Sequence, residues 1–344
     1  MPPLRAITNF RLYLTYLARR LVTMILTLLA LSVVVFVVIQ LPPGDFVTSY
    51  IASLSAAGES VDQDTITALR DRYKLDSPVL VQYWAWFSEM LRGDFGYSFE
   101  MQTPVSEIFS QRIGISLAVE LTAVVVMWAV SIPIGIYSAV NQYSLGDYVA
   151  TVLGFLGLAI PNFLFALVLM YICYNWFGVT ITGLFSPEYM NARWSLDRFL
   201  DFASHVWAPI LVISTAGAAQ LVRVLRANLL DELNKPYVLT ARAKGLTRRR
   251  LIWRYPVRVA MNPLVSTIGW VLPTVISSSF VTAIVLNLPT LSPILLRALL
   301  SQDMYLAGAL IMFMGLLTLV GTLISDLLLA WIDPRIRLGM VGAN

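Results

Sequence analysis

The residues with the strongest chemical character in this chain are cations gathered in one stretch, residues 223–262, called here the basic loop. It contains ten Lys or Arg residues and two acids, a local charge of +8, whereas the whole 344-residue chain sums to +4. Long apolar runs flank the loop on both sides. By the positive-inside rule, such an excess of cations predicts a cytoplasmic loop of a membrane protein. The cations are Arg223, Arg226, Lys235, Arg242, Lys244, Arg248, Arg249, Arg250, Arg254 and Arg258.

The centre of the basic loop predicts a short helix. Residues 236–245 read Pro-Tyr-Val-Leu-Thr-Ala-Arg-Ala-Lys-Gly. Proline suits the first turn of a helix, and glycine suits its end because it adopts left-handed backbone conformations. We expect this helix to lie parallel to the membrane, with Ala241 and Ala243 giving a smooth surface that enters a groove of a soluble partner. The alternative is that the arginines only contact lipid headgroups.

Two acids within apolar runs, Glu120 and Asp326, are the other candidates for chemistry. Ionisable residues inside a membrane commonly serve ion or proton pathways, but a proton relay needs a chain of such groups. A secondary carrier or channel that uses these two acids is therefore the alternative hypothesis from a different class. The single His205 excludes a His-rich metal site.

Motifs of enzymes are missing from the sequence. It contains no His-Glu-x-x-His, no Gly-x-Ser-x-Gly and no phosphate-binding Gly-x-x-x-x-Gly-Lys-[Ser/Thr] loop. We predict that the chain is not an enzyme. If it moves a solute against a gradient, the energy must come from another subunit.

The composition predicts the elements that position these residues. The chain is 58% hydrophobic and 13% charged, too apolar for a soluble domain of this size. We predict an all-α integral membrane protein with six transmembrane helices, because a span needs about 20 apolar residues. Placing both termini in the cytoplasm puts sixteen of the 24 Lys and Arg residues on the inner side. The predicted spans are residues 21–41, 115–140, 149–177, 205–221, 263–286 and 306–332.

These spans divide the chain into regions. The first apolar run is followed by Pro-Pro-Gly-Asp rather than a cleavage site, so we expect a retained span and not a signal peptide. The basic residues lie at the ends of apolar segments, which argues against nucleic-acid binding. The expected regions are a cytoplasmic N-terminus (1–20), the first transmembrane helix (21–41), a sizeable external loop region (42–112), a five-helix core that includes the basic loop (113–332) and a cytoplasmic C-terminus (333–344).

Several ordered motifs resemble one family of transport proteins. They are Pro42-Pro43-Gly44-Asp45, Leu75-Asp76-Ser77-Pro78, the run Leu-Arg-Gly-Asp-Phe-Gly-Tyr-Ser at 91–98, Ile160-Pro161-Asn162-Phe163, residues 237–246 of the basic loop, and Asp-Pro-Arg-Ile-Arg at 333–337. Over nearly its whole length the chain resembles the first of the two permease subunits of ABC importers for dipeptides, oligopeptides and nickel. The resemblance implies a type I importer permease in the cytoplasmic (inner) membrane of a prokaryote.

The resemblance also implies partners. These are a second homologous permease, two ATPase subunits, an external substrate-binding protein and membrane lipid. ATP and Mg would bind to the ATPase subunits, and this chain would hold no cofactor or metal. Closure of the ATPases would rock the spans between inward-open and outward-open states. The implied ATPase-coupling residues are Tyr237, Thr240, Ala241, Arg242, Ala243, Lys244 and Gly245, and a bulky charge at Ala241 or Ala243 is expected to uncouple transport without unfolding the protein.

The substrate pathway is assigned to polar residues of the predicted fifth span. Their alternative role is hydrogen bonding to their own helix backbone. The following segment, 282–291, lacks the Glu, Phe and glycines of the family pattern. The resemblance implies di- or oligopeptides as substrates, and this divergence keeps oligosaccharides or nickel as alternatives. The pathway candidates are Ser266, Thr267, Thr274, Ser277, Ser278, Ser279 and Thr282.

Overall fold

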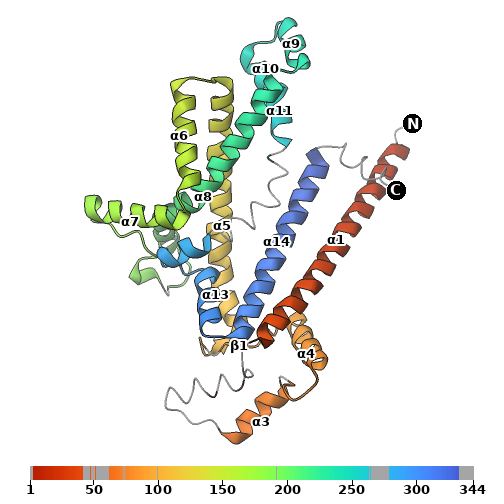
Figure 1. The fold of residues 1–344 in the computed structure, drawn as a ribbon, viewed down its shortest axis with the longest axis vertical. Coiled ribbons are helices and arrows are strands. Elements are labelled where there is room, and N and C mark those ends of the chain that lie inside the picture. Colours follow the sequence, from red (N-terminus) through yellow and green to blue (C-terminus); the bar gives the residue numbers. More distant parts are fainter. Residues whose placement is uncertain are drawn as a thin grey trace. The chain divides into compact units, whose positions relative to one another are not determined.

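Helices form most of the regular structure in a computed structural model of the chain (Figure 1). The structure describes residues 3–41, 47, 51, 62–72, 74–98, 100–190, 192–262, 264 and 279–332. In this part of the chain the all-α prediction is confirmed, apart from one two-stranded hairpin. The elements are α1 (Pro3–Gln40), α3 (Gln63–Arg72), α4 (Val79–Leu91), β1 (Tyr97–Ser98), β2 (Thr103–Pro104), α5 (Val105–Val140), α6 (Leu145–Ala159), α7 (Asn162–Phe177), the 3-10 helix η1 (Pro187–Tyr189), α8 (Leu196–Leu233), α9 (Pro236–Ala243), α10 (Arg248–Arg254), α11 (Pro256–Ala260), α13 (Leu291–Leu300) and α14 (Met304–Ile332).

Four helices in the described part of the chain are long and apolar enough to cross a membrane. They lie in α1, α5, α8 and α14. The last three each contain a predicted span, and α1 contains the first span except for its last residue, Leu41. The helices extend beyond the predicted apolar runs. Their polar end residues lie outside the hydrocarbon core but continue the backbone hydrogen bonding of the helix. Most of the predicted fifth span, including residues 265–278, lies outside the described residues.

The predicted third span is two helices rather than one continuous helix. α6 and α7 meet at a bend of 107°. Neither helix alone is long enough to cross a membrane, so the two form one span only as a bent pair. The break has a local cause. Ile160, which precedes Pro161, has an extended backbone with φ −89° and ψ 119°, because a proline disfavours the helical conformation in the residue before it. The apolar pattern alone hid this break.

The chain folds into two compact units, and each is built from segments that are distant in sequence. The first consists of Met1–Tyr13, Leu117–Pro289 and Thr318–Asn344, and the second of Leu14–Ser116 and Thr290–Leu317. In the first unit, α8 packs against α6, α7 and α11. Small residues permit this packing: a Cβ added at Gly157 of α6 would lie 3.2 Å from Thr215 Cγ2 and 3.3 Å from Ala219 Cβ of α8.

Aromatic residues hold the second unit together. Val35 and Phe36 of α1, Trp86 of α4 and Tyr305 of α14 form a buried cluster. The Tyr83 hydroxyl of α4 lies 2.8 Å from Ser32 Oγ of α1, so a polar contact fixes the aromatic helix α4 against α1. The region predicted as an external loop therefore contains ordered helical structure.

A buried carboxylate also caps α14 in this unit. Asp303 is fully buried, accepts a 2.6 Å hydrogen bond from Ser98 Oγ of β1, and accepts a 3.2 Å bond from the Leu306 backbone N–H. The second contact is an N-cap, which satisfies one of the unpaired donors in the first helical turn.

Asp303→Ala should destabilise the protein by about 2 kcal/mol, because it removes the cap and leaves the Ser98 hydroxyl without this acceptor. The measurement is the midpoint of thermal unfolding in a mild detergent. Asp303→Asn is the matched control, since it keeps an acceptor oxygen and should lose less. Equal unfolding midpoints for wild type and Asp303→Ala would contradict the assignment of Asp303 as the stabilising cap of α14.

Candidate functional site

The site begins in the last turns of α8, because residues 223–233 of the basic loop are helical and continue that helix (Figure 1). Asn234 and Lys235 separate α8 from α9, and Pro236 occupies the first turn of α9 as predicted. Gly245 follows the helix with φ +77°, the left-handed conformation that glycine adopts without strain. The predicted short helix is therefore present.

The predicted coupling residues do not all lie on one face of α9. Val238 and Ala241 are its buried residues, with 0% and 6% of their surface exposed, and they are three positions apart on one side of the helix. The inward position of Ala241 means that a bulky charge there would disturb packing, so the effect expected from the sequence changes for this residue. The exposed predicted residues are Tyr237, Thr240, Arg242, Ala243, Lys244 and Gly245.

Tyr237 has a structural contact in addition to an exposed surface. Its hydroxyl donates a hydrogen bond to the Glu232 carboxylate at the end of α8. Partial desolvation of the phenol, together with this carboxylate, raises the pKa of Tyr237 above its ordinary value. The phenol therefore stays protonated at physiological pH and remains a donor that holds α9 on α8.

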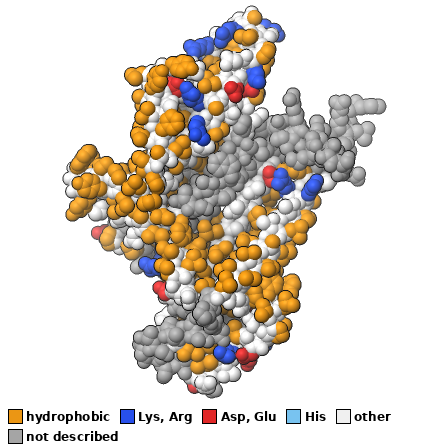
Figure 2. All heavy atoms as spheres, in the orientation of Figure 1, with side chains coloured by type: hydrophobic (Ala, Val, Ile, Leu, Met, Phe, Trp, Pro, Cys, Tyr) orange, Lys and Arg blue, Asp and Glu red, His pale blue; other side chains and the backbone are white. Residues whose placement is uncertain are grey.

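Exposed cations lie on α9 and on the helices that follow it, α10 and α11. Figure 2 shows Lys and Arg side chains gathered on the part of the surface where Figure 1 places α9 and α10. Within the described part of the chain, these side chains are exposed and have no hydrogen bond or ion pair, so their charges are available to a partner. They are Arg242, Lys244, Arg249, Arg250, Arg254 and Arg258.

One further cluster was not predicted from the sequence. The Asp147 side chain, 3% exposed, accepts from Arg226 Nε at Oδ1 and from Arg226 Nη2 at Oδ2, both at 2.9 Å. Ser138 Oγ also donates to Asp147 Oδ1, and the Tyr143 backbone N–H donates to Oδ2 at 2.9 Å. Two-point pairing between a guanidinium and a carboxylate is strong and fixes the geometry of both groups.

The sequence contains the residues of this cluster in two distant segments, and neither segment alone points to their pairing. Asp147 follows Ser144 by three residues, and the Ser144 hydroxyl accepts a bond from the Asp147 N–H as the N-cap of α6. Arg226 stands beside Leu225 on the helix that carries the basic loop. In the sequence, Asp147 is an acid three residues after Ser144 and Arg226 is one cation of the basic loop, and only the packing of α6 on α8 brings them together.

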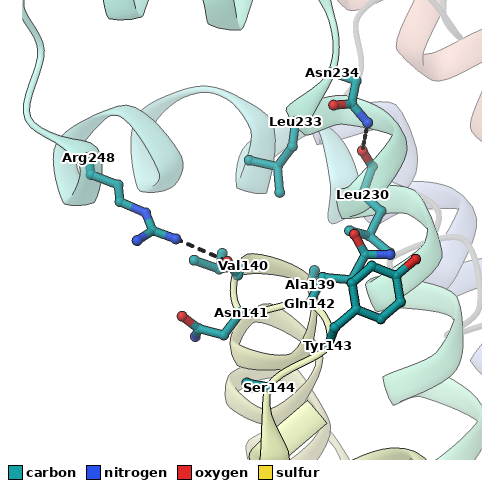
Figure 3. Close-up of a pocket in the computed structure, with 10 residues that line it drawn as sticks. All are labelled: Ala139, Val140, Asn141, Gln142, Tyr143, Ser144, Leu230, Leu233, Asn234 and Arg248. Atoms are coloured by element: carbon teal, nitrogen blue, oxygen red, sulfur yellow. Dashed lines mark hydrogen bonds between the residues drawn. The ribbon is translucent and has the colours of Figure 1, made fainter. Parts of the chain in front are cut away.

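A hollow of about 520 Å³ lies at the turn between α5 and α6, and it is lined in part by Tyr143, whose backbone N–H bonds Asp147 (Figure 3). It is bounded by residues 139–144 at the α5–α6 turn, by the end of α8 and by Arg248. Arg248 Nη2 donates a 3.0 Å hydrogen bond to the backbone carbonyl of Val140, drawn as a dashed line in Figure 3. The basic loop is therefore bonded to the turn between α5 and α6.

The pathway role of the predicted residues stays a prediction. Ser266, Thr267, Thr274, Ser277 and Ser278 lie outside the described residues. Thr282 is fully buried, and Ser279, 3% exposed, donates a 3.4 Å hydrogen bond to Glu120. Among the residues that the structure describes, no group of three His, Cys, Asp or Glu side chains is placed to hold a metal ion.

The fold and the site together define a class of protein. Several long apolar helices make it a multi-pass membrane protein, and the exposed face of the short helix α9, within the basic loop, is the feature available to a soluble partner.

Comparison with known proteins gives the family. Residues 131–338 match the binding-protein-dependent transport system inner membrane component, and residues 13–120 match the N-terminal model for the membrane components of the same systems. The chain therefore belongs to the family of inner-membrane permease components of binding-protein-dependent transport systems. This confirms the resemblance inferred from the sequence motifs.

Individual relatives match over nearly their whole length. The oligopeptide transport system permease protein AppB of Bacillus subtilis is 34% identical, with 94% of this chain and 99% of the relative covered. The oligopeptide permease protein OppB of Mycobacterium bovis is 32% identical, covering 94% and 98%. The dipeptide permease protein DppB of Escherichia coli K12 is 29% identical, covering 94% and 99%.

Proposed function

We propose that this chain is the non-catalytic permease subunit of an ATP-driven importer of di- or oligopeptides and forms half of its translocation pathway. The observation that carries the proposal is the exposed face of α9, with small and cationic side chains, in a chain that belongs to the family of binding-protein-dependent permeases. The curated relatives described above are peptide permeases by name, which supports peptides as the substrate class.

The proposed topology has six spans with both termini in the cytoplasm. The described helices supply four long spans and the bent pair α6–α7, and the apolar run at 263–286 supplies the remaining one. This arrangement places the basic loop on the inner side, where the positive-inside rule puts an excess of Lys and Arg. It also places the loop where ATPase subunits are accessible.

The proposed complex contains a second homologous permease, two ATPase subunits and an external substrate-binding protein. The sequence has no phosphate-binding loop of the Gly-x-x-x-x-Gly-Lys-[Ser/Thr] type, so ATP and Mg would bind to the partner ATPases. ATP binding would favour one of two permease conformations, and the contact at α9 would transmit that preference to the spans. The residues proposed for the contact are the exposed set on α9 and Gly245.

Purification of this chain from its native membrane in a mild detergent should recover a second permease and ATPase subunits, identified by mass spectrometry. Reconstituted with the binding protein, the complex should import labelled di- or oligopeptides only when ATP is supplied. Nickel and oligosaccharides tested in the same vesicles are the substrate controls. A chain that purifies alone and still transports solute in liposomes would refute the proposal and support a carrier that uses Glu120 and Asp326.

A further inference from the structure

The turn between α5 and α6 is bonded to the basic loop on both sides of α9 in the sequence. Arg226, ten residues before α9, reaches Asp147 at the start of α6. Arg248, five residues after α9, reaches the carbonyl of Val140 at the end of α5. Each of these two bonds therefore joins the basic loop to one helix of the α5–α6 pair.

The Arg226 bond is built as a rigid connection. Asp147 is buried, and donors from Arg226, Ser138 and the Tyr143 backbone share its two oxygens. Arg226 donates to both oxygens, so rotation of either side chain would break charge-assisted bonds. The Asp147 carboxylate is not needed to cap α6, because the Ser144 hydroxyl accepts the hydrogen bond from the Asp147 N–H. Both carboxylate oxygens therefore bind Arg226 of another helix.

The Arg248 bond joins α10 to the end of α5, and these two helices are not otherwise in close contact. The hollow of about 520 Å³ separates Arg248 from the end of α8, and the Arg248 side chain lies at the hollow with its guanidinium on Val140 (Figure 3). At this point a side chain, rather than apolar packing, connects α10 to the turn. A connection of this kind can be removed by mutation without opening a cavity in the core.

We infer that Arg226 and Arg248 form a clamp that makes the α5–α6 pair move together with the basic loop when the ATPases act on α9. This inference rests on the proposed function. In it, Arg226, Asp147 and Arg248 are positioning residues: they contact neither substrate nor ATP, and they carry a displacement of α9 to two membrane-spanning segments. Without the clamp, α9 moves with the ATPases while α5 and α6 lag behind.

The test uses the complete complex in proteoliposomes and measures the number of ATP molecules hydrolysed per labelled peptide imported. Arg226→Met should raise this ratio about tenfold, the size of a typical coupling free energy between two sites. Arg248→Met should raise it less, because it removes one bond to a neutral acceptor. Arg226→Lys should give an intermediate ratio, since it keeps the charge but loses the two-point geometry.

A matched control is available on the same helix as Arg226. Arg223 of α8 is exposed and has no hydrogen bond or ion pair among the described residues. Arg223→Met should therefore keep the wild-type ratio. Wild-type ratios in Arg226→Met and Arg248→Met would overturn the inference. If Arg226→Met does not assemble, Arg226→Lys and Arg248→Met decide between the two outcomes.

A distance measurement tests the same inference without relying on turnover. Spin labels at Gln142→Cys and Thr247→Cys, in a Cys173→Ser background, report the separation of the α5–α6 turn and the basic loop in the assembled complex. With the clamp intact, the distance distribution should not change on ATP binding, whereas Arg226→Met should broaden or shift it. An ATP-dependent change in the complex with the intact clamp would overturn the inference.

The two hypotheses fail in different ways. If no ATPase accompanies the wild-type chain, the proposed function fails. If the wild-type complex couples ATP hydrolysis to import and the clamp variants couple equally well, only the clamp is refuted.

Discussion

Ala243→Glu is expected to abolish coupled import while leaving the permease folded. Ala243 is exposed on α9 between Arg242 and Lys244, so the new side chain needs no space inside the protein. In the assembled complex it would place a charge in the proposed ATPase contact, and burial of a charge without a partner costs several kcal/mol. A loss of about 3 kcal/mol corresponds to about a hundredfold weaker association. The measurements are ATPase recovery during purification and peptide import.

Two further variants define the control for this result. Ala243→Ser adds one small polar group at the same exposed position and should retain import. Ala241→Glu places the same charge at a buried position of α9, so it should lower the thermal unfolding midpoint of the isolated permease, which Ala243→Glu should not. Full import by Ala243→Glu would contradict the assignment of this face to the ATPase contact.

Gly157→Leu is expected to have the largest effect on stability. A Cβ at this position already lies 3.2 to 3.3 Å from side-chain atoms of Thr215 and Ala219. Three further carbons cannot fit between α6 and α8, so these helices must separate. We expect a loss of about 3 kcal/mol, seen as a lower thermal unfolding midpoint in detergent.

Gly154→Leu is the matched control for this variant. Gly154 lies about one turn earlier on the same helix, and a Cβ there would meet no atom within 4 Å. The same substitution should therefore leave the midpoint close to that of the wild type. Similar losses for both variants would show that glycine at 157 serves backbone flexibility rather than close packing of α6 on α8.

The substitution at Gly157 also bears on the clamp. Asp147 lies in the first turn of the helix that contains Gly157, and Arg226 lies on the helix that contains Thr215 and Ala219. A partial separation of α6 from α8 would lengthen the Asp147–Arg226 contact. Folded Gly157→Leu protein, if recovered, should therefore resemble Arg226→Met in the ATP used per peptide imported.

The sequence by itself determined the class of fold and the place of the basic loop. Apolar runs of about 20 residues specify helices in a membrane because every backbone polar group must be satisfied within the segment. Pro236 and Gly245 marked the short helix α9 because they restrict or permit particular backbone angles. These are local properties, so the order of residues along the chain is enough to predict them.

The tertiary structure decided which face of each helix is buried and which is exposed. Ala241 and Ala243 have identical side chains two residues apart, yet one is buried and the other exposed, because only packing fixes the rotation of α9. The break between α6 and α7 was missed for a different reason: Pro161 is a local signal for it, but the apolar residues on both sides favoured a single span. The Asp147–Arg226 pair joins residues 79 positions apart. Such a contact depends on how α6 packs on α8, and no local pattern in the sequence encodes it.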